Sequence, residues 1–492
     1  MDPQLKEYYE RELRHLRGIA GEFAAEFPKI ASRLALDSFE CADPYVERLL
    51  EGYAFLAARV QLKVDAEFPR FTEHLLEFIY PHYLAPTPSM TVVQMQPDPS
   101  EGSLAEGVTI PRDTILHSQI GKGEQTACEY RTAHEVTLWP VEITAAEYLS
   151  GQAIANLGAP SLPGLKAGIR LRLRTTAGLT FKQLTLDRLT LFLRGGGALP
   201  SQLYEQLLAN ALALAVLPVN PAETRWCEVV GNRPVRRLGF EDSQALLPVG
   251  PRSFQGYRLL HEYFAFPERF LFVELTGLRQ AFQRCDGAEL DLVVMLDRHQ
   301  PHLHNALEAS QFALFCAPAI NLFPHRADRI HLTHRDAEYQ IIPDRTRPLD
   351  FEAYGLAEVK GYGANPGEEQ TFLPFYGSNN GYRRQGEGAY YTLRRKKRLL
   401  SVKQRRQGQR SSYIGSESFI ALVDAQQAPY ASELKQLGLD IFCTNRDLPL
   451  HMPLGAGATD FTLQTGAPVQ SIRCVAGPTR PRPSLSGGGA LA

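Results

Sequence analysis

Two segments near the start of the chain share one apolar rhythm, and this rhythm constrains the fold more than any other feature. Apolar side chains recur at spacings of 4-3-4-3-4 residues in both segments: Tyr9, Leu13, Leu16, Ala20, Phe23 and Phe27 in the first, and Val46, Leu50, Tyr53, Ala57, Val60 and Val64 in the second. A mean spacing of about 3.5 residues places such side chains on one narrow face of an α-helix. The rhythm therefore predicts helices that pack lengthwise in a bundle.

Prolines set the expected limits of these helices. The first is expected over residues 2–27, ahead of Pro28, and the second over residues 43–68, ahead of Pro69. A third helix is expected from residue 71 to the break at Pro81. Each of the first two opens with Asp-Pro, a good pair of cap and first-turn residues. The helical part is thus predicted to end near residue 90.

The second helix is expected to need apolar cover on two sides. At 100° per residue, Phe55 and Leu62 point away from the face that carries Val46 and Val64. Each apolar seam spans fewer than three heptads, so an ordinary hairpin within the chain fits the pattern as well as a bundle between chains.

Beyond residue 90 the pattern changes to short alternating strands separated by Gly and Pro. The clearest are at 168–175, 188–195, 269–277, 289–297, 338–344, 418–424 and 439–445. Strands with few crossover helices predict antiparallel sandwiches or barrels, so the fold class is α+β. We expect a helical arm for the bundle (1–90), a β-rich body (91–376), a basic glycine-rich loop or insertion (377–415), a β-rich segment (416–476) and a disordered tail (477–492).

Composition excludes several classes of protein. A length of 492 residues allows about three domains. The net charge of -2 gives no general attraction to nucleic acid or membrane. The seven cysteines form no CxxC pair and are expected to be free thiols in a reducing compartment. No signal peptide and no apolar run as long as a membrane span is visible, so we expect a cytoplasmic protein without membrane insertion.

No motif in the sequence predicts catalysis, a cofactor or a metal. Two groups of histidines are candidate zinc ligands: His299 with His302 and His304, and His331 with His334. Pro301 breaks any helix that would align the first group. The sequence has no nucleophile elbow, no SxxK and no phosphate loop. A hydrolase of β-sandwich fold would need converging acids or histidines that the sequence does not supply.

The segment from Arg383 to Arg410 stands out by its charge. It holds eleven Lys or Arg and one acid, Glu387, which gives +11 - 1 = +10. The positive charge is most concentrated at Arg394, Arg395, Lys396, Lys397, Arg398, Arg405 and Arg406. Three interpretations stay open: a solvated basic loop, a docking patch for an acidic protein surface, and a tyrosine-assisted platform for single-stranded nucleic acid. Because the rest of the chain is acidic, we expect no nucleic acid.

Several long motifs, in order along nearly the whole chain, resemble one family. They include YYERELRHLRGIAGEFAAEFPKIASRL, DPYVERLLEGYAFLAARVQLKVDAEFPRFTEHLLEFIYPHYLAPTPSM, IPRDTIL, YRTAHEVTLWPVEI, LLHEYFAFPERFLFVEL, LFCAPAINLFPHRAD and CTNRDLP. In these stretches the sequence resembles TssF, also called VasA or ImpG, the baseplate wedge subunit of bacterial type VI secretion systems.

The resemblance implies a structural component without enzymatic activity, in the bacterial cytoplasm at a baseplate docked to the inner membrane. It implies TssG as the principal partner, a second TssF copy in the same wedge, and TssE and TssK beside them, beneath the sheath and around the spike hub. The apolar side chains of the first two helices, Phe55 and Leu62 included, would then contact these partners. Family members typically continue beyond the PTRPRPSLSGGGALA region, so we expect truncation before a C-terminal domain.

Overall fold

The structure is a computed structural model. It describes residues 3–34, 43–100, 102–219, 226–231, 234–250, 253–333, 335–365, 367–375, 389–400, 406, 408, 410–424 and 434–486. The chain divides into two compact units, Met1–Leu84 with Leu485–Ala492, and Ala85–Ser484. Each unit has its own fold.

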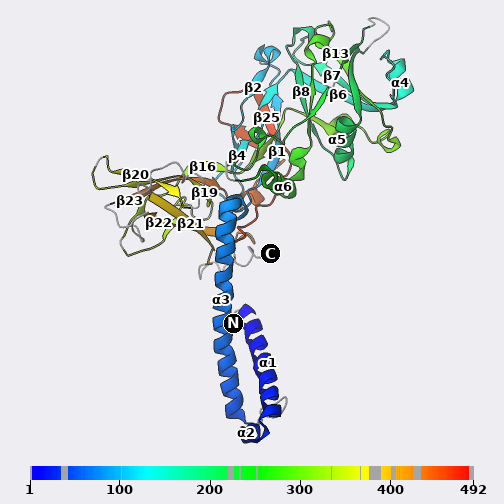
Figure 1. The fold of residues 1–492 in the computed structure, drawn as a ribbon. Helices are drawn as coiled ribbons and strands as arrows, with labels where there is room; N and C mark the ends of the chain where they lie inside the picture. The colour runs from blue at the N-terminus through cyan, green and yellow to red at the C-terminus, as the bar shows by residue number, and fades with distance from the viewer. Residues whose placement is uncertain are drawn as a thin grey trace. The chain divides into compact units, whose positions relative to one another are not determined.

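The first unit is a helical arm. It contains α1 (Pro3–Glu26), α2 (Pro28–Arg33) and α3 (Pro44–Ile79). α1 and α3 run side by side in opposite directions, with α2 at the turn (Figure 1). The N-terminus of α3 is capped as the sequence predicts, because the Asp43 Oδ1 atom accepts a hydrogen bond from the Tyr45 amide at 2.8 Å and Pro44 occupies the first turn.

The expectation that Pro69 ends the second helix is wrong. α3 is one helix of 36 residues that continues through residue 69 and ends before Pro81. A proline inside a helix removes one hydrogen bond and costs about 3 kcal/mol, which kinks or weakens a helix without forcing the chain to leave it. The second and third predicted helices therefore form one long rod.

The second unit contains a closed barrel. Its strands follow the order β1-β15-β4-β3-β24-β25, with bounds Met90–Pro97, Cys316–Ile320, Glu129–Thr132, Ile115–Ser118, Phe461–Leu463 and Val469–Ala476. The strands come from both ends of the unit, so segments more than 350 residues apart in sequence pair directly, for example Val93 with Cys474. A small sheet of β2 (Val108–Ile110) and β5 (Val136–Leu138) accompanies the barrel.

Two further antiparallel sheets share a hydrophobic core with the barrel. The first has the order β10-β9-β13-β7-β6, with bounds Glu228–Val230, Ala211–Pro218, Glu289–Leu296, Ala167–Thr175 and Val141–Ser150. The second has the order β11-β12-β8-β14, with bounds Val235–Arg237, Phe272–Thr276, Arg188–Leu193 and Phe312–Leu314. Short helices flank them: α4 (Gly151–Asn156), α5 (Leu199–Ala209), α6 (Gln255–Ala265) and α7 (Arg279–Phe282).

An eight-stranded sheet with its own core completes the unit. The order is β16-β23-β19-β20-β21-β22-β18, with β17 beside β23. The bounds are Phe323–Arg326, Gln436–Thr444, Glu352–Tyr362, Glu369–Pro374, Ala389–Lys397, Ser416–Asp424 and Tyr339–Ile341, and Ile330–His331 for β17. The basic segment is therefore not simply a loop, since β21 pairs with β22 over its full length. Residues 376–388 lie outside the described part of the chain.

The expected disorder of residues 477–492 is wrong for its first part. The Thr479 amide donates to the Met90 carbonyl at 2.8 Å, and Thr87 and Arg482 form a β-bridge. These backbone hydrogen bonds hold residues 479–482 against the start of the barrel. They also satisfy backbone N–H and C=O groups that are shielded from water there. Residues 487–492 lie outside the described part. The prediction of a separate β-rich segment over residues 416–476 is also wrong, because the strands of this segment join two different sheets.

The predicted fold class is confirmed. The chain combines helices with a β-barrel and several antiparallel sheets, and all seven strands that the sequence predicted most clearly are present. β13 shows why they were visible: it is buried along nearly its whole length and pairs on both sides, so its residues are almost continuously apolar.

Candidate protein interface

The contact between α1 and α3 is built on small side chains of α3. Ala54 and Ala58 are 0% exposed and lie one turn apart on the same face. The Tyr8 hydroxyl donates to the Asp65 Oδ2 atom at 2.6 Å, and the Arg17 guanidinium pairs with Glu47. Alanines let the two helices approach closely, while the polar pairs hold their register near both ends.

On α1 the predicted seam faces this contact. Tyr9, Leu13, Leu16 and Phe23 are half-buried, whereas Phe27, beyond the end of the helix, is exposed. The seam of α1 is thus occupied within the chain over most of its length. In this structure α1 packs against α3 of the same chain, as the simpler alternative of a helical hairpin predicts.

On α3 the predicted seam is not the face that α1 covers over most of its length. Val46 and Leu50 are half-buried, but Tyr53, Val60 and Val64 are 63%, 63% and 55% exposed. α1 instead covers the face that carries the alanines. A rhythm of large apolar residues does not reveal which face a neighbouring helix prefers when a row of alanines permits a closer approach.

The two side chains expected on the far face of α3 also differ from the prediction. Leu62, one turn beyond Ala58, is half-buried on the side of the α1 contact, and Phe55 is exposed. The expectation that this helix needs apolar cover on two sides stays a prediction.

A long apolar row on α3 is left uncovered, and we call it the exposed stripe. Its residues are Tyr45, Leu49, Tyr53, Leu56, Val60, Val64, Phe71, Leu75 and Phe78, all exposed. Several of them recur eleven residues apart, as do Leu49, Val60 and Phe71, which is 3.67 residues per turn and keeps the row nearly parallel to the helix axis. The stripe runs from Tyr45 to Phe78, a rise of about 50 Å at 1.5 Å per residue.

The exposed stripe continues into a shallow groove beside α1. The groove is lined almost entirely by apolar atoms, with Leu16 on one helix and Val46, Leu49, Leu50, Tyr53 and Leu56 on the other. Contiguous apolar surface of this extent on a protein marks an interaction site more often than an ordinary solvated face. The arm is the strongest candidate interface in the described chain.

The basic residues of β21 are largely engaged within the protein. Arg394 and Lys396 both pair with Glu338, at 3.1 and 2.8 Å, and these contacts lower the pKa of Glu338. Arg395 donates to backbone carbonyls, including that of Ala353 at 3.0 Å. Arg398 lies 3.8 Å from Glu417. Lys397 and Arg406 are exposed, and Arg405 lies outside the described residues. The cluster therefore offers little free charge for a partner.

Arg410, also in the basic segment, joins three acids. Its guanidinium contacts Glu124, Asp350 and Asp447 at 2.9, 2.9 and 2.6 Å. Burial of Arg410 works against its charge, but the hydrogen bonds that it donates to Asp447 and Asp350 outweigh burial and raise its pKa. A half-buried arginine with three acidic partners is a structural link between segments.

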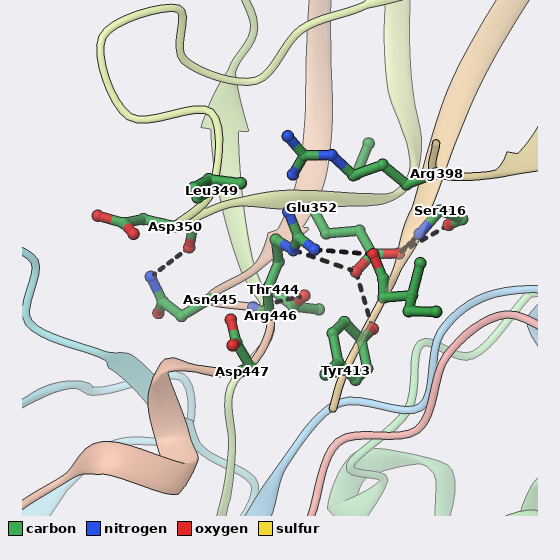
Figure 2. Close-up of polar contacts among 12 residues, drawn as sticks. Leu349, Asp350, Glu352, Arg398, Tyr413, Ser416, Thr444, Asn445, Arg446 and Asp447 are labelled. Atoms are coloured by element: carbon green, nitrogen blue, oxygen red, sulfur yellow. Dashed lines mark hydrogen bonds and ion pairs between the residues drawn. The ribbon is translucent and has the colours of Figure 1, made fainter. Parts of the chain in front are cut away.

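The CTNRDLP motif lies at this link (Figure 2). Asn445 accepts hydrogen bonds from the Glu129 amide and from the side chain of Asn321, at 3.0 and 2.7 Å. Arg446, with φ +51°, donates to the Ile414 carbonyl at 2.9 Å. The motif thus connects the barrel, through β4, to the eight-stranded sheet. Sequence reasoning missed this role, and the run of polar residues directly after a buried strand was the available signal.

Glu352 organises the other half of the cluster in Figure 2. It is buried and accepts from the Tyr413 hydroxyl at 2.8 Å and from the Ser416 amide and hydroxyl, each at 2.7 Å. Burial and the adjacent carboxylate raise the pKa of Tyr413 well above its ordinary value, so the phenol stays a donor. The labelled acids, Asp350, Glu352 and Asp447, all accept hydrogen bonds from other residues of the chain, so the cluster is a connected polar network.

His302 and His304, from the first predicted histidine group, have separate hydrogen-bond partners. His302 contacts Gln202 at 3.1 Å and His304 contacts the Tyr148 carbonyl at 3.1 Å, each on its own. His331 lies in β17, and His334 falls outside the described residues. Within the part of the chain that the structure describes, no group of three or more His, Cys, Asp or Glu could hold a metal ion. In the same part, no helix is long and apolar enough to cross a membrane.

Comparison with known proteins places the chain in one family. The family model for the type VI secretion system protein TssF matches residues 1–491. A relative in Pseudomonas aeruginosa strain PAO1, the type VI secretion system component TssF1, is 58% identical over 486 residues, which cover 98% of this chain and 78% of the relative.

Solved structures give the same result. A cryo-electron microscopy structure of the type VI secretion system TssK-TssF-TssG baseplate subcomplex contains a similar chain at 26% identity and a TM-score of 0.63, covering 89% of this chain and 74% of that one. The baseplate complex from the type VI secretion system gives 25% identity and a TM-score of 0.50, covering 97% and 77%.

The similar solved chains belong to a large protein assembly, the baseplate. The chain belongs to the TssF family, and it is a structural component of the type VI secretion system baseplate.

Proposed function

We propose that the exposed stripe of α3 and the adjoining groove are the surface through which this baseplate component binds helices of TssG and of a second copy of its own family. The length of the uncovered row, about 50 Å, suits a helix laid along α3 rather than a loop that touches one point. The single observation that carries the proposal is the exposure of nine large apolar side chains on one face of one helix.

The similar solved chains support the choice of partners. One is part of a TssK-TssF-TssG subcomplex and the other part of a baseplate complex. We extend to this chain a wedge role with TssG as principal partner, TssK and TssE beside it, and the sheath and spike hub as neighbours. The α1 seam, largely covered by α3, is secondary in this proposal.

We also propose that the protein has no enzymatic activity and that it works in the bacterial cytoplasm, at a baseplate docked to the membrane. The lack of activity is supported by the buried ionisable groups described above, because most of them are hydrogen-bonded or ion-paired to other residues of the same chain. A cytoplasmic place is supported by the buried cysteines: burial raises the pKa of Cys128 to about 12 and raises those of Cys316 and Cys443 further, and none is paired in a disulfide.

The test replaces exposed residues of the stripe in co-expression with the TssG-type partner encoded beside this chain. Tyr53→Asp with Val60→Asp places two charges in an apolar contact and leaves the alanine face untouched. Since burying an unpaired charge costs several kcal/mol, we expect co-purification with the partner to be lost. Mass measurement of the wild-type complex is expected to give two copies of this chain for one TssG.

Arg14→Asp is the matched control. It changes a charge on the exposed side of α1, opposite its seam and away from the stripe, and is expected to leave the complex intact. Circular dichroism of both variants shows whether α3 is still folded. A folded double variant that binds the partner as the wild type does would remove the stripe from the interface.

A further inference from the structure

We propose that a cavity between β5 and the strands β8 and β12 is a binding site for a carboxylate group, a site unrelated to the arm. The cavity has a volume of about 520 Å³. Thr137 on β5 lines one wall, and Thr190 and Glu274 on β8 and β12 line the other. Arg112 and His134 also line it, and they supply the chemistry.

Arg112 lacks an acidic partner. Its Nη2 atom donates to the Ala245 carbonyl at 2.9 Å, while its Nε atom is buried and has no hydrogen-bond partner among the described residues. In the same described part of the chain, no carboxylate lies within ion-pairing distance of Arg112. A guanidinium offers adjacent N–H groups that match the two oxygens of a carboxylate, so Arg112 is suited to such a ligand.

His134 supports an anion at the same place. It is 7% exposed, and its Nε2 atom has no partner among the described residues. Burial lowers the pKa of His134 to about 3, and the nearby charges of Arg269 and Arg112 contribute. A carboxylate beside Arg112 would offset this positive charge and raise the pKa of His134. The imidazole could then donate its Nε2–H to the ligand.

The rest of the lining favours one carboxylate over a more highly charged anion. Glu135 and Arg188 are exposed at the cavity, and Glu274 is half-buried with a pKa raised by burial. A phosphate dianion would face two acids on these walls, whereas a single carboxylate near Arg112 meets one unpaired cation. A free small acid and an Asp or Glu side chain of a protein partner would both supply this group.

The inner wall of the cavity is firmly held by hydrogen bonds. The Gln244 and Ala245 carbonyls accept from Arg269 and Arg112, at 2.8 and 2.9 Å, and the buried Glu262 accepts from the next two amides, at 3.1 and 3.0 Å. A rigid wall reduces the ordering cost of binding.

The first arm of the test titrates sodium glutarate and sodium acetate into the full chain, with sodium chloride at equal ionic strength as reference. We expect a rise in melting temperature that depends on the acid, and movement of the His134 ring signals in selectively labelled protein. Arg112→Gln is expected to weaken glutarate binding about tenfold or more, because a charge-assisted bond is lost. Arg298→Gln, an exposed arginine elsewhere, is expected to leave binding unchanged.

Because Arg112 also holds the Ala245 carbonyl, a second variant guards against misfolding. Thr190→Phe adds bulk to the opposite wall and is expected to abolish the response while the melting temperature without acid stays close to that of the wild type. Equal responses in the wild type and both variants would show non-specific binding and overturn the site.

The second arm tests a protein source. A photo-crosslinking residue at position 190 is introduced into the chain co-expressed with its TssG-type partner, and the cross-linked peptide is identified by mass spectrometry. Attachment beside an Asp or Glu that is required for the cross-link would assign the carboxylate to the partner. Absence of both the acid-dependent response and such a cross-link would refute the proposal.

Discussion

At the scale of single residues, the body is held together by buried charges with several partners each. Asp447 shows the balance: burial works to raise its pKa, but hydrogen bonds from Arg410 and Ser411 outweigh burial and lower it below the ordinary value of 3.8. The charged form is therefore the stable one in the folded chain. Removing one partner leaves the others buried without compensation, which costs more than the pair itself contributes.

Asp447→Asn should reveal this balance as a dependence on pH. A carboxyl whose pKa is lowered by folding stabilises the protein above its unfolded pKa, and this stability is lost as the pH falls through the folded pKa. We expect the variant to be less stable by about 1 to 3 kcal/mol near neutral pH, with the difference shrinking below pH 3.8. Urea unfolding over a pH series measures it. Asp286→Asn, at an exposed pair, should show almost no difference at any pH.

The alanine row of α3 gives a second prediction at this scale. Ala58→Leu adds three carbons where α1 and α3 meet, and overpacking of this kind costs about 1 to 3 kcal/mol. We expect helical signal to be lost at a lower temperature, as followed by circular dichroism. Ala25→Leu, on the exposed side of α1, is the matched control and should be neutral. An unaffected Ala58 variant would mean that the two helices are not in close contact.

At the scale of secondary-structure elements, periodicity predicted the kind of element well and its packing face poorly. The rhythm of α3 was visible in the sequence, but the face that α1 covers is set by Ala54 and Ala58, which carry little hydrophobic signal. β21 shows a similar limit. Its four consecutive basic residues, Arg394 to Lys397, hide the alternation of a strand, and only pairing with β22 and the contacts to Glu338 explain its place in a sheet.

The ion pairs of β21 predict that this strand does not hold nucleic acid. Arg394→Gln with Lys396→Gln should leave the retention of single-stranded DNA or RNA no lower than that of the wild type near 0.15 M salt, because both cations already pair with Glu338. Retention assays at several salt concentrations test this. A steep, salt-dependent loss in the double variant would restore the nucleic-acid alternative.

At the scale of the whole molecule, the two units differ in how much they bury. Among the described side chains of residues 5–79, only Ala31, Ala54 and Ala58 are buried, whereas residues 85–484 contain four clusters of buried hydrophobic side chains. Local stability follows buried contacts, so the arm should open more readily than the body. Its stability is expected to depend on a partner.

Hydrogen exchange measured by mass spectrometry tests this difference. In the chain alone, amides of α3 should exchange faster than those of β13 and β7, and addition of the TssG-type partner should slow exchange along α3 far more than in the barrel. The Tyr53→Asp with Val60→Asp variant provides the control, since the partner should no longer protect it. Equal protection of arm and body without a partner would contradict this expectation.

The sequence by itself determined the local features of this protein. Spacing identified the helical arm and most strands, because burial of one face leaves a period in the residues, and long ordered motifs indicated the TssF family. Tertiary structure alone decided which face of α3 stays uncovered, how β1 pairs with β25 across the chain, and that Arg112 forms no ion pair among the described residues. These outcomes depend on which residues distant in sequence come into contact, and no local pattern records that.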